Sequence, residues 1–379
     1  MKLESTAGTL AAALSSAELA LDDRSNIEAL KMVRLIVGDD RVEFTVDALD
    51  RRVAASVPVS VIETGEALAR CVSLTGVLAK LHSDQTVQLV RNENQVLIIA
   101  GRSRFKIPGL SLDLLPQPVA PADAAVEFSL ATKDLLRLVE ATSYAASDEE
   151  KRYYINGIFL HIGNAEPRTL RSVATDGHRF AQIDLPLPTS AGNMPGVIVP
   201  NKTVDIIVKL LRRKDVAASV QLRVSSRLLE LSLPDLRLTS KLIDQTFPDY
   251  ARVIPKEYGA AAHVDRDELA AAIARVEATI NPETKGMMRT VALAWNDGAL
   301  HVGRTDPGAD VDDVIDAETN GAGKTALRIA LAEDTLNALT GKRVVVAVDN
   351  PGTPIHFANP DDPSTFAIVM PIRGMNASS

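Results

Sequence analysis

The sequence contains one cysteine, Cys71, and few aromatic residues. A single cysteine excludes an internal disulfide framework and a cysteine-rich zinc site. Cys71 lies in the apolar run ALARCVSLTGVLAKL, so we expect it to be buried as a small hydrophobic residue. Aromatic residues make up 4% of the 379 residues while the hydrophobic total is 46%, so the cores should consist of Ala, Val, Leu and Ile. No apolar run approaches the ~20 residues of a membrane-spanning helix, and we expect no membrane association.

The first 23 residues are rich enough in Ala and Leu to be mistaken for a secretory signal peptide. Their apolar positions Leu10, Leu14, Ala17 and Leu21 recur at helical spacing, and polar residues such as Glu18 interrupt any continuous apolar region. The segment therefore predicts an amphipathic helix of a cytoplasmic protein.

Charge is unevenly balanced: 41 Lys and Arg against 49 Asp and Glu give a formal net charge of −8. This balance argues against a protein that binds nucleic acid over its whole surface. It remains compatible with a local basic face on an acidic body.

A loose internal repeat divides the chain into thirds. The tetrapeptide Val139–Thr142 recurs as Val276–Thr279, an offset of 276 − 139 = 137 residues. Each copy lies in a segment with helical periodicity, 131–146 and 265–280, and 6–21 is a weaker counterpart. One face of the middle helix carries Leu135, Leu138, Val139 and Thr142. A second helix is predicted in each third, at 69–81, 201–213 and 330–339.

Short runs with alternating apolar residues predict the strands. They occupy 41–46, 51–59, 86–90, 95–100, 153–162, 219–224, 228–233, 236–243, 290–295, 299–303, 343–348 and 366–372. Because strands follow one another with few helices between them, an α+β fold with antiparallel sheets is favoured over βαβ winding. Proline-rich segments near 115–125 and 255–262 mark boundaries, which predicts three domains at 1–122, 123–258 and 259–379.

Two patterns associated with cofactors are incomplete. Asn320–Thr325 (NGAGKT) ends like a phosphate-binding loop, but Glu318 stands where the motif needs its first glycine, so a turn is predicted. The six histidines are scattered without metal-ligand spacing. We therefore expect no nucleotide, cofactor or metal.

The segment Thr175–Arg179 (TDGHR), with Ser172 nearby, allows a hydrolase hypothesis based on Asp176, His178 and a serine. No Gly-x-Ser-x-Gly motif is present, and adjacent residues of a strand–turn–strand point in different directions. Asp-Gly is common in hairpin turns. The residues favour a structural turn, and we do not expect an enzyme.

Lys151–Tyr154 places two cations beside two aromatic residues at the start of a predicted strand. Such a cluster can pair with phosphates and stack rings on a nucleic-acid backbone. A charged loop leading into a half-buried strand explains it equally well.

Several segments along the chain carry a family resemblance. They are Gly101–Phe105 (GRSRF), Lys151–Phe159 (KRYYINGIF), Val173–Ala181 (VATDGHRFA), Val197–Val204 (VIVPNKTV), Leu238–Pro255 (LTSKLIDQTFPDYARVIP) and Ile368–Arg373 (IVMPIR). In their order and spacing they resemble the bacterial sliding clamps, the β subunits of DNA polymerase III. The resemblance implies three similar domains, each with two helices and antiparallel sheets. It also implies a head-to-tail homodimer that closes a six-domain ring around duplex DNA. Such a ring is retained by topology and needs only a weakly basic inner surface.

The same resemblance assigns residues to DNA and to the dimer. The residues expected to face DNA are Arg24, Arg152, Tyr153, Tyr154 and Lys202. Asn201 replaces a second cation that relatives often carry beside Lys202, so that contact is expected to be weaker. The dimer interface is expected to join the surroundings of Phe105 and Ile107 to the helix of the partner's ARVEATI segment. There, Ala278 and Thr279 replace larger apolar residues.

A pocket for partner peptides is implied between the second and third domains. The expected partners are DNA polymerase III and other polymerases, the clamp loader, and mismatch-repair and ligase-type proteins. The expected lining is Ile155, Thr175, Gly177, His178, Arg179, Phe180, Pro248, Arg252, Val253, Val369, Met370, Pro371, Ile372 and Arg373. Methionine suits several ligands, and arginine offers donors to peptide carbonyls. Three departures concern this pocket: Phe180 stands where an aliphatic residue is common and predicts a narrower subsite, Ala251 replaces a frequent arginine, and 374–379 extend past Arg373. An alternative is a clamp-like paralogue that binds peptides without loading on DNA.

Overall fold

The computed structural model describes residues 1–114, 125–164, 166–255, 257–306 and 309–372. Contacts within the chain define two compact units. The first unit comprises Met1–Lys133, Pro188–Pro195 and Asp205–Leu242; the second comprises Asp134–Leu187, Gly196–Val204 and Ile243–Ser379. The middle third of the chain contributes to both units.

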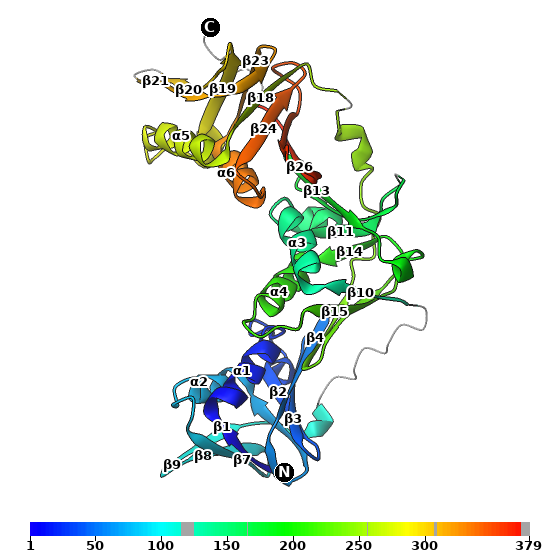
Figure 1. The fold of residues 1–379 in the computed structure, drawn as a ribbon. Helices are drawn as coiled ribbons and strands as arrows, with labels where there is room; N and C mark the ends of the chain where they lie inside the picture. Colours follow the sequence, from blue (N-terminus) through cyan, green and yellow to red (C-terminus); the bar gives the residue numbers. More distant parts are fainter. Residues whose placement is uncertain (115–124, 165, 256, 307–308, 373–379) are drawn as a thin grey trace. The chain divides into compact units, whose positions relative to one another are not determined.

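The same series of elements occurs three times along the chain (Figure 1). In each repeat a strand leads into a helix, further strands lead into a second helix, and three strands follow. The first repeat consists of β1 (Lys2–Thr6), α1 (Ala7–Glu18), β2 (Met32–Val37), β3 (Arg41–Asp47), β4 (Arg51–Pro58), β5 (Ser60–Glu63), β6 (Gly65–Arg70), α2 (Cys71–Leu78), β7 (Thr86–Asn92), β8 (Gln95–Ala100) and β9 (Ser103–Pro108).

The second and third repeats preserve this order. The second consists of β10 (Val126–Ala131), α3 (Thr132–Ser143), β11 (Gly157–Ile162), β12 (Thr169–Thr175), β13 (Arg179–Pro186), β14 (Val197–Pro200), α4 (Asn201–Leu211), β15 (Ser219–Val224), β16 (Leu228–Leu233) and β17 (Leu236–Lys241). The third consists of β18 (Ala260–Asp265), α5 (Arg266–Ala278), β19 (Thr290–Asn296), β20 (Ala299–Asp306), β21 (Ala309–Asp316), β22 (Glu318–Asn320), β23 (Gly323–Arg328), α6 (Ile329–Ala338), β24 (Arg343–Val348), β25 (Ile355–Asn359) and β26 (Asp362–Val369).

Two of the four sheets join strands of different repeats. The eight-stranded sheet has the order β10-β15-β16-β17-β4-β3-β2-β6, and the nine-stranded sheet has the order β14-β11-β12-β13-β26-β25-β24-β18-β22. We call the antiparallel pairs β17–β4 and β26–β13 the internal seams. In each seam, the last strand of one repeat pairs with a strand of the preceding repeat, the third one after that repeat's first helix. The five-stranded sheet (β5-β1-β7-β8-β9) and the four-stranded sheet (β21-β20-β19-β23) end at β9 and β21, which have no partner on one side among the described residues.

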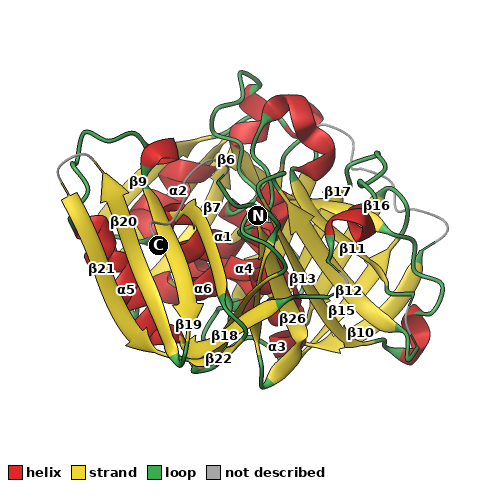
Figure 2. Cartoon of the chain, turned by 90° about the horizontal axis from the view of Figure 1, so that it is seen from above, coloured by secondary structure: helices red, strands yellow, loops and turns green. Residues whose placement is uncertain are grey.

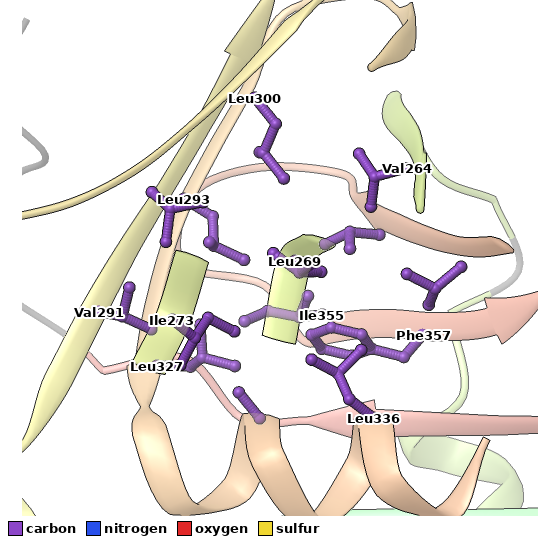
Figure 3. Packing of buried hydrophobic residues seen from close by; sticks show 14 of the residues in the cluster. Val264, Leu269, Ile273, Val291, Leu293, Leu300, Leu327, Leu336, Ile355 and Phe357 are labelled. Atoms are coloured by element: carbon purple, nitrogen blue, oxygen red, sulfur yellow. The ribbon is translucent and has the colours of Figure 1, made fainter. Parts of the chain in front are cut away.

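Helices cover one face of the strands in each repeat. Figure 2 shows α5 against β20 and β21. Asp265 caps the start of this helix: its carboxylate accepts hydrogen bonds from the backbone N–H groups of Asp267 (2.9 Å) and Glu268 (3.0 Å). A cap of this kind stabilises a helix by about 1 kcal/mol. The core beneath is aliphatic apart from a few rings: Leu269, Ile273 and Leu336 from the helices face Leu293, Leu300 and Phe357 from the strands (Figure 3).

Most sequence-based expectations for the elements are confirmed. The six helices fall within or next to their predicted segments, and the predicted face of α3 is buried. Cys71 has no exposed surface, and burial raises the pKa of its thiol to about 12. The turn predicted for Asn320–Thr325 is confirmed only at Gly321 and Ala322, where Gly321 has φ +73°; Asn320 ends β22, and β23 begins at Gly323.

Several boundaries were wrong, three of them as follows. Lys2–Thr6 form a strand paired with β5 and β7, so the N-terminal helix starts only at Ala7, where Thr6 caps it. The predicted strand 153–162 starts at Gly157, because Glu150–Ile155 form the 3-10 helix η3. The last strand ends at Val369, and Met370 leaves the sheet.

Candidate functional site

The turn between β12 and β13 is held by short side-chain hydrogen bonds. The Asp176 carboxylate accepts the backbone N–H groups of His178 (2.7 Å) and Arg179 (2.9 Å). The Thr175 hydroxyl donates to the Arg179 carbonyl oxygen (2.7 Å), and Gly177 between them has φ +87°, which a residue with a Cβ rarely adopts. The turn presents Gly177 and His178 to solvent.

This geometry gives no support to the hydrolase hypothesis. The Asp176 oxygens are engaged by backbone N–H groups and by the Arg179 guanidinium (Nε, 3.0 Å). The Ser172 hydroxyl is fully buried and shares a hydrogen bond of 2.8 Å with the Thr142 hydroxyl. Ser172, His178 and Asp176 are therefore not arranged as the nucleophile, base and acid of a hydrolase.

Arg179 is committed to contacts within the chain. Its side chain is 13% exposed, and Nη1 donates to Asp334 Oδ2 of α6 at 2.5 Å. Its guanidinium lies 5.3 Å from the centroid of the Tyr144 ring, and burial raises the pKa of that tyrosine to about 12. Through Nη1 the side chain fastens the β12–β13 turn to α6, and the contact of Arg179 with a partner peptide stays a prediction.

Beyond the end of β26, Met370 and Ile372 are held by backbone hydrogen bonds. The Met370 N–H donates to the His178 carbonyl oxygen (2.8 Å), and the Ile372 N–H donates to the Ala326 carbonyl oxygen (2.8 Å). The Met370 side chain is 39% exposed. Residues 370–372 thus form a wall beside the β12–β13 turn.

The β12–β13 turn and residues 370–372 form two walls of the site, and the segment before β18 forms a third. It includes the 3-10 helix η5 (Tyr250–Val253), in which Val253 is 48% exposed, and the exposed Pro248. Arg252 is exposed and pairs with Asp249 at 2.8 Å.

Beneath these walls lies a ring-rich cluster in the second unit. Phe180 stacks on Tyr250 with centroids 5.2 Å apart, and Phe247 stacks on Phe159 at 4.9 Å. Ile155, Phe180 and Ile368 are at most 3% exposed within this cluster. We refer to the exposed residues Gly177, His178, Pro248, Arg252, Val253 and Met370 as the rim. The cluster below the rim is its floor.

The structure brings most of the predicted pocket residues together in the second unit. Exposed members form the rim, Thr175, Pro371 and Ile372 are half-buried, and Ile155, Phe180 and Val369 are buried. Arg373 and the tail 374–379 lie outside the described residues. Tyr250, Phe247 and Phe159 were missed, although the run TFPDY within the segment Leu238–Pro255 already signalled an aromatic contribution.

The predicted DNA residues are placed as follows. Tyr153 is 51% exposed in η3 beside the exposed Lys151, whereas Tyr154 packs against the floor. Lys202 is exposed in the first turn of α4, and Arg24 is exposed in the first unit. Nε and Nη2 of Arg152 donate to Glu149 and lower the pKa of that carboxyl, and the contact of Arg152 with DNA stays a prediction. A Cβ placed at Gly177 would lie 2.9 Å from Arg152 Nη1, so Arg152 borders the rim as well.

Across the described part of the chain, no group of three or more His, Cys, Asp and Glu side chains is arranged to hold a metal ion. A search of the described helices found none with the length and apolar character needed to span a bilayer.

Comparisons with known proteins agree in all three repeats. Family models of the DNA polymerase III beta subunit match residues 1–118 (N-terminal domain), 129–249 (central domain) and 251–373 (C-terminal domain). The Beta sliding clamp of Caulobacter vibrioides is 32% identical over 382 residues, covering 98% of this chain and all of that protein. The chain belongs to the bacterial sliding clamp family.

Other relatives of the clamp support the same assignment. The Beta sliding clamp of Pseudomonas aeruginosa is 28% identical and covers 93% of this chain and 94% of its own. A DnaN sliding clamp from Bartonella birtlesii, solved bound to griselimycin, has a TM-score of 0.92 at 27% identity, with 99% and 100% coverage. The C. crescentus clamp, solved with PEG bound to its putative beta-motif tethering region, has a TM-score of 0.91 at 29% identity, with 99% of both chains covered. The fold is the three-domain clamp fold, and the function is that of a replication processivity clamp rather than of the paralogue considered as an alternative.

Proposed function

We propose that two copies of this clamp associate head to tail into a closed ring around duplex DNA. The ring would hold DNA polymerase III and other partners in the cytoplasm through the rim of each second unit. The proposed role is mechanical: the ring encircles DNA and offers partners a docking surface, and it involves no catalysis, cofactor or metal. The domain boundaries that accompany this proposal are 1–122, 123–258 and 259–379.

The observation that carries the ring is the topology of the seams. The last strand of the second repeat (β17) pairs with β4, and the last strand of the third repeat (β26) pairs with β13. By the same rule, β9 of the first repeat should pair with β21, the counterpart of β4 and β13. In one chain these two strands end separate sheets. The same rule pairs β9 of one copy with β21 of the next copy, and we call this pairing the closing seam.

A closing seam would also complete the sheet pattern. Joining β5-β1-β7-β8-β9 to β21-β20-β19-β23 gives a nine-stranded order that matches the nine-stranded sheet across the β26–β13 seam. The contact joins different surfaces of the two copies, so it must close after a fixed number of steps or produce a filament. Two chains of three repeats closing as a dimer give the six-domain ring of the family resemblance.

Weak, local DNA contacts suit such a ring. Arg24, Lys202 and Tyr153 are exposed, while Arg152 is paired with Glu149 and contributes less net positive charge. Few phosphate contacts give modest affinity that salt weakens, whereas a threaded ring is retained by topology. A ring loaded on nicked circular DNA should therefore survive high salt and leave once the circle is linearised.

Partner proteins would dock peptides on the rim. We assign the described members of the predicted lining to this role, together with Tyr250 as part of the floor. The partners we propose are polymerases, the clamp loader, and mismatch-repair and ligase-type proteins. A labelled clamp-binding peptide should bind in fluorescence anisotropy with low-micromolar affinity, which corresponds to roughly −8 kcal/mol.

The decisive test of the ring is mass in solution. Light scattering across a dilution series should give 2 × 40.6 kDa at micromolar concentration. A mass that stays at one chain would overturn the proposal. Loss from circular and linear DNA at the same salt concentration would instead favour simple electrostatic binding.

A further inference from the structure

The β26–β13 seam carries the floor of the rim on one face of its sheet. Phe180 of β13 lies opposite Ile368 of β26, and Gln182 lies opposite Phe366. Tyr250 stacks on Phe180 with ring centroids 5.2 Å apart. Aromatic rings of the chain therefore fill this face of the seam.

The β17–β4 seam has polar and small side chains in the corresponding rows. Arg52, the second residue of β4, lies opposite Thr239, and Ala54 lies opposite Arg237. Residues opposite each other, and residues two apart on one strand, point to the same face of a sheet. The flanking strands β3 and β16 continue both rows with four further polar residues: Asp47, Thr45, Glu230 and Ser232.

A trough of about 590 Å³ lies over these rows within the first unit, and we call it the seam trough. Helix α1 packs on β3 and β4 from the opposite face, where Val53 and Ala55 are buried. The β3–β4 turn with the exposed Leu49 lies at one end of the trough, and the β16–β17 turn with the exposed Pro234 lies at the other. Its volume falls within the range of roughly 300–1,000 Å³ that is typical of ligand sites.

Two cations in the seam trough are available to a ligand. Arg237 and Lys241 of β17 are exposed and line the trough, and neither has an ion-pair partner within the part of the chain that the structure describes. Arg52 differs from them, because it is paired with Asp47 of the neighbouring strand. Carboxylates of a ligand would therefore find their partners along β17.

We propose that the seam trough binds an extended acidic peptide segment of a partner protein, with acidic residues at positions i and i+4. Arg237 and Lys241 are four residues apart on one strand, so their side chains leave the same face about 13 Å apart. An extended peptide presents residues i and i+4 on one face at the same spacing. Thr239 lies between the two cations and offers a hydroxyl to the peptide backbone. This site is separate from the rim and does not depend on ring closure.

The flanking charges favour such a peptide over nucleic acid. Glu43 and Asp47 of β3 line one side of the trough, and Glu230 of β16 lines the other. A nucleic-acid strand carries a charge at every phosphate, and these carboxylates would repel it. A peptide with two acidic residues separated by neutral ones places its charge only at Arg237 and Lys241.

Two peptides of identical composition test the spacing. In fluorescence anisotropy with the full chain, a labelled heptapeptide of sequence GDSASDG should bind with a dissociation constant of about 10⁻⁴–10⁻³ M. Its isomer GDSADSG places the two acidic residues on opposite faces of an extended chain and should bind at least about threefold more weakly. Binding of the first peptide should weaken with added NaCl, because the two cations are exposed. Equal affinity for both peptides overturns the proposed spacing.

Substitutions in the trough test its location. Arg237→Gln and Lys241→Gln should each raise the dissociation constant of the heptapeptide roughly threefold to fivefold. Ala54→Trp fills the trough without changing its charge and should weaken binding at least about tenfold, with thermal unfolding as the check that the variant folds. Lys80→Gln, at an exposed cation just after α2, is the control and should bind like the unmodified chain. Binding that none of the three trough variants weakens would refute the site.

Competition separates this site from the other surfaces of the clamp. An excess of unlabelled clamp-binding peptide should leave the heptapeptide bound; displacement would place the heptapeptide on the rim and overturn the proposal. A single-stranded oligonucleotide that binds more tightly than the heptapeptide, and is weakened by Arg237→Gln, would make the trough a nucleic-acid surface instead. Neither readout requires the ring, since a chain that remains a monomer in light scattering still presents the trough.

Discussion

Phe180 and Tyr250 lie face to face, with ring centroids 5.2 Å apart and planes inclined by 24°. Phe180 is 2% exposed, so Tyr250 and its neighbours cover it. The Tyr250 hydroxyl is 3.0 Å from His161 Nε2 and accepts a hydrogen bond from Arg171 Nη1 at 3.3 Å. Arg171 is in turn paired with Asp184. Aromatic rings of the chain itself thus fill the floor of the candidate peptide site. His161 of β11 and Arg171 of β12 hold the Tyr250 ring in place.

Replacing Phe180 should widen this floor. We predict that Phe180→Leu binds a peptide with a terminal aromatic anchor several-fold more tightly, because the smaller side chain leaves space beside Tyr250. The same change should reduce the free energy of unfolding by about 1–2 kcal/mol through lost packing. Anisotropy titrations and denaturant unfolding measure the two effects, and Phe366→Leu, at a half-buried ring that neighbours Phe180, is the matched control. Unchanged or weaker peptide binding by Phe180→Leu would show that Phe180 does not limit the subsite.

The Gly177 turn should be intolerant of a side chain. Its φ of +87° and the 2.9 Å approach of Arg152 Nη1 to a Cβ predict that Gly177→Ala lowers the free energy of unfolding by about 1–2 kcal/mol. Peptide binding should weaken too, since the turn carries His178. Gly352→Ala is the control, because a Cβ there meets nothing within 4 Å and its φ is not positive. Equal stability of both variants would refute the strain argument.

Local sequence patterns predicted elements well where one face is buried. Leu135, Leu138 and Val139 repeat at helical spacing because α3 packs on a sheet, and the same holds for α5. Residues 153–156 were wrongly predicted as part of a strand because of their apolar content. They lie at the end of a 3-10 helix, η3, whose two tyrosines face different environments. Local periodicity carries no information on such a turn.

The site was predictable in its members but not in its contacts. The family segments named most of the rim, yet Arg179 is held by Asp334, 155 positions away, and Tyr250 reaches His161 across 89 positions. That β9 and β21 end separate sheets was likewise not predictable from local patterns, because it depends on the order of strands that lie far apart in the sequence.

Acid should destabilise the second unit through His356. Burial lowers the pKa of this imidazole to about 4 from an ordinary value of 6.5, and its ring lies between Tyr258 and Phe366. Below pH 6.5 the unfolded chain takes up the proton and the folded chain does not. Stability is therefore lost as pH falls from about 6.5 to about 4, by up to about 3 kcal/mol. His161, whose pKa burial also lowers, acts in the same direction.

His356→Phe isolates this effect, because it keeps a ring in the stack and removes the titrating group. Denaturant unfolding at pH 7.5 and pH 5 should show a smaller loss of stability for this variant than for the unmodified chain. His82→Gln, at an exposed histidine of the first unit, is the control and should behave like the unmodified chain. An identical pH response of His356→Phe and the unmodified chain would contradict the assignment.

Truncation should separate peptide docking from ring closure. Val369 is fully buried and pairs with Arg179, so a deletion that removes it would damage the sheet. A chain ending at Val369 loses Met370 and the two backbone hydrogen bonds that fasten residues 370–372 to His178 and Ala326. Peptide binding should fall at least about tenfold, since one wall and its exposed apolar side chain are removed. The dimer should persist, because β9 and β21 are untouched.

The matched control for this truncation is a deletion of residues 374–379 alone, which keeps the wall and should retain peptide binding. Anisotropy with the labelled peptide and light scattering on the same samples report docking and ring closure independently. If the chain ending at Val369 binds peptide as tightly as the full chain, the rim is not the docking surface. If it binds weakly but also becomes a monomer, docking and closure share residues, which contradicts the separation of the rim from the closing seam.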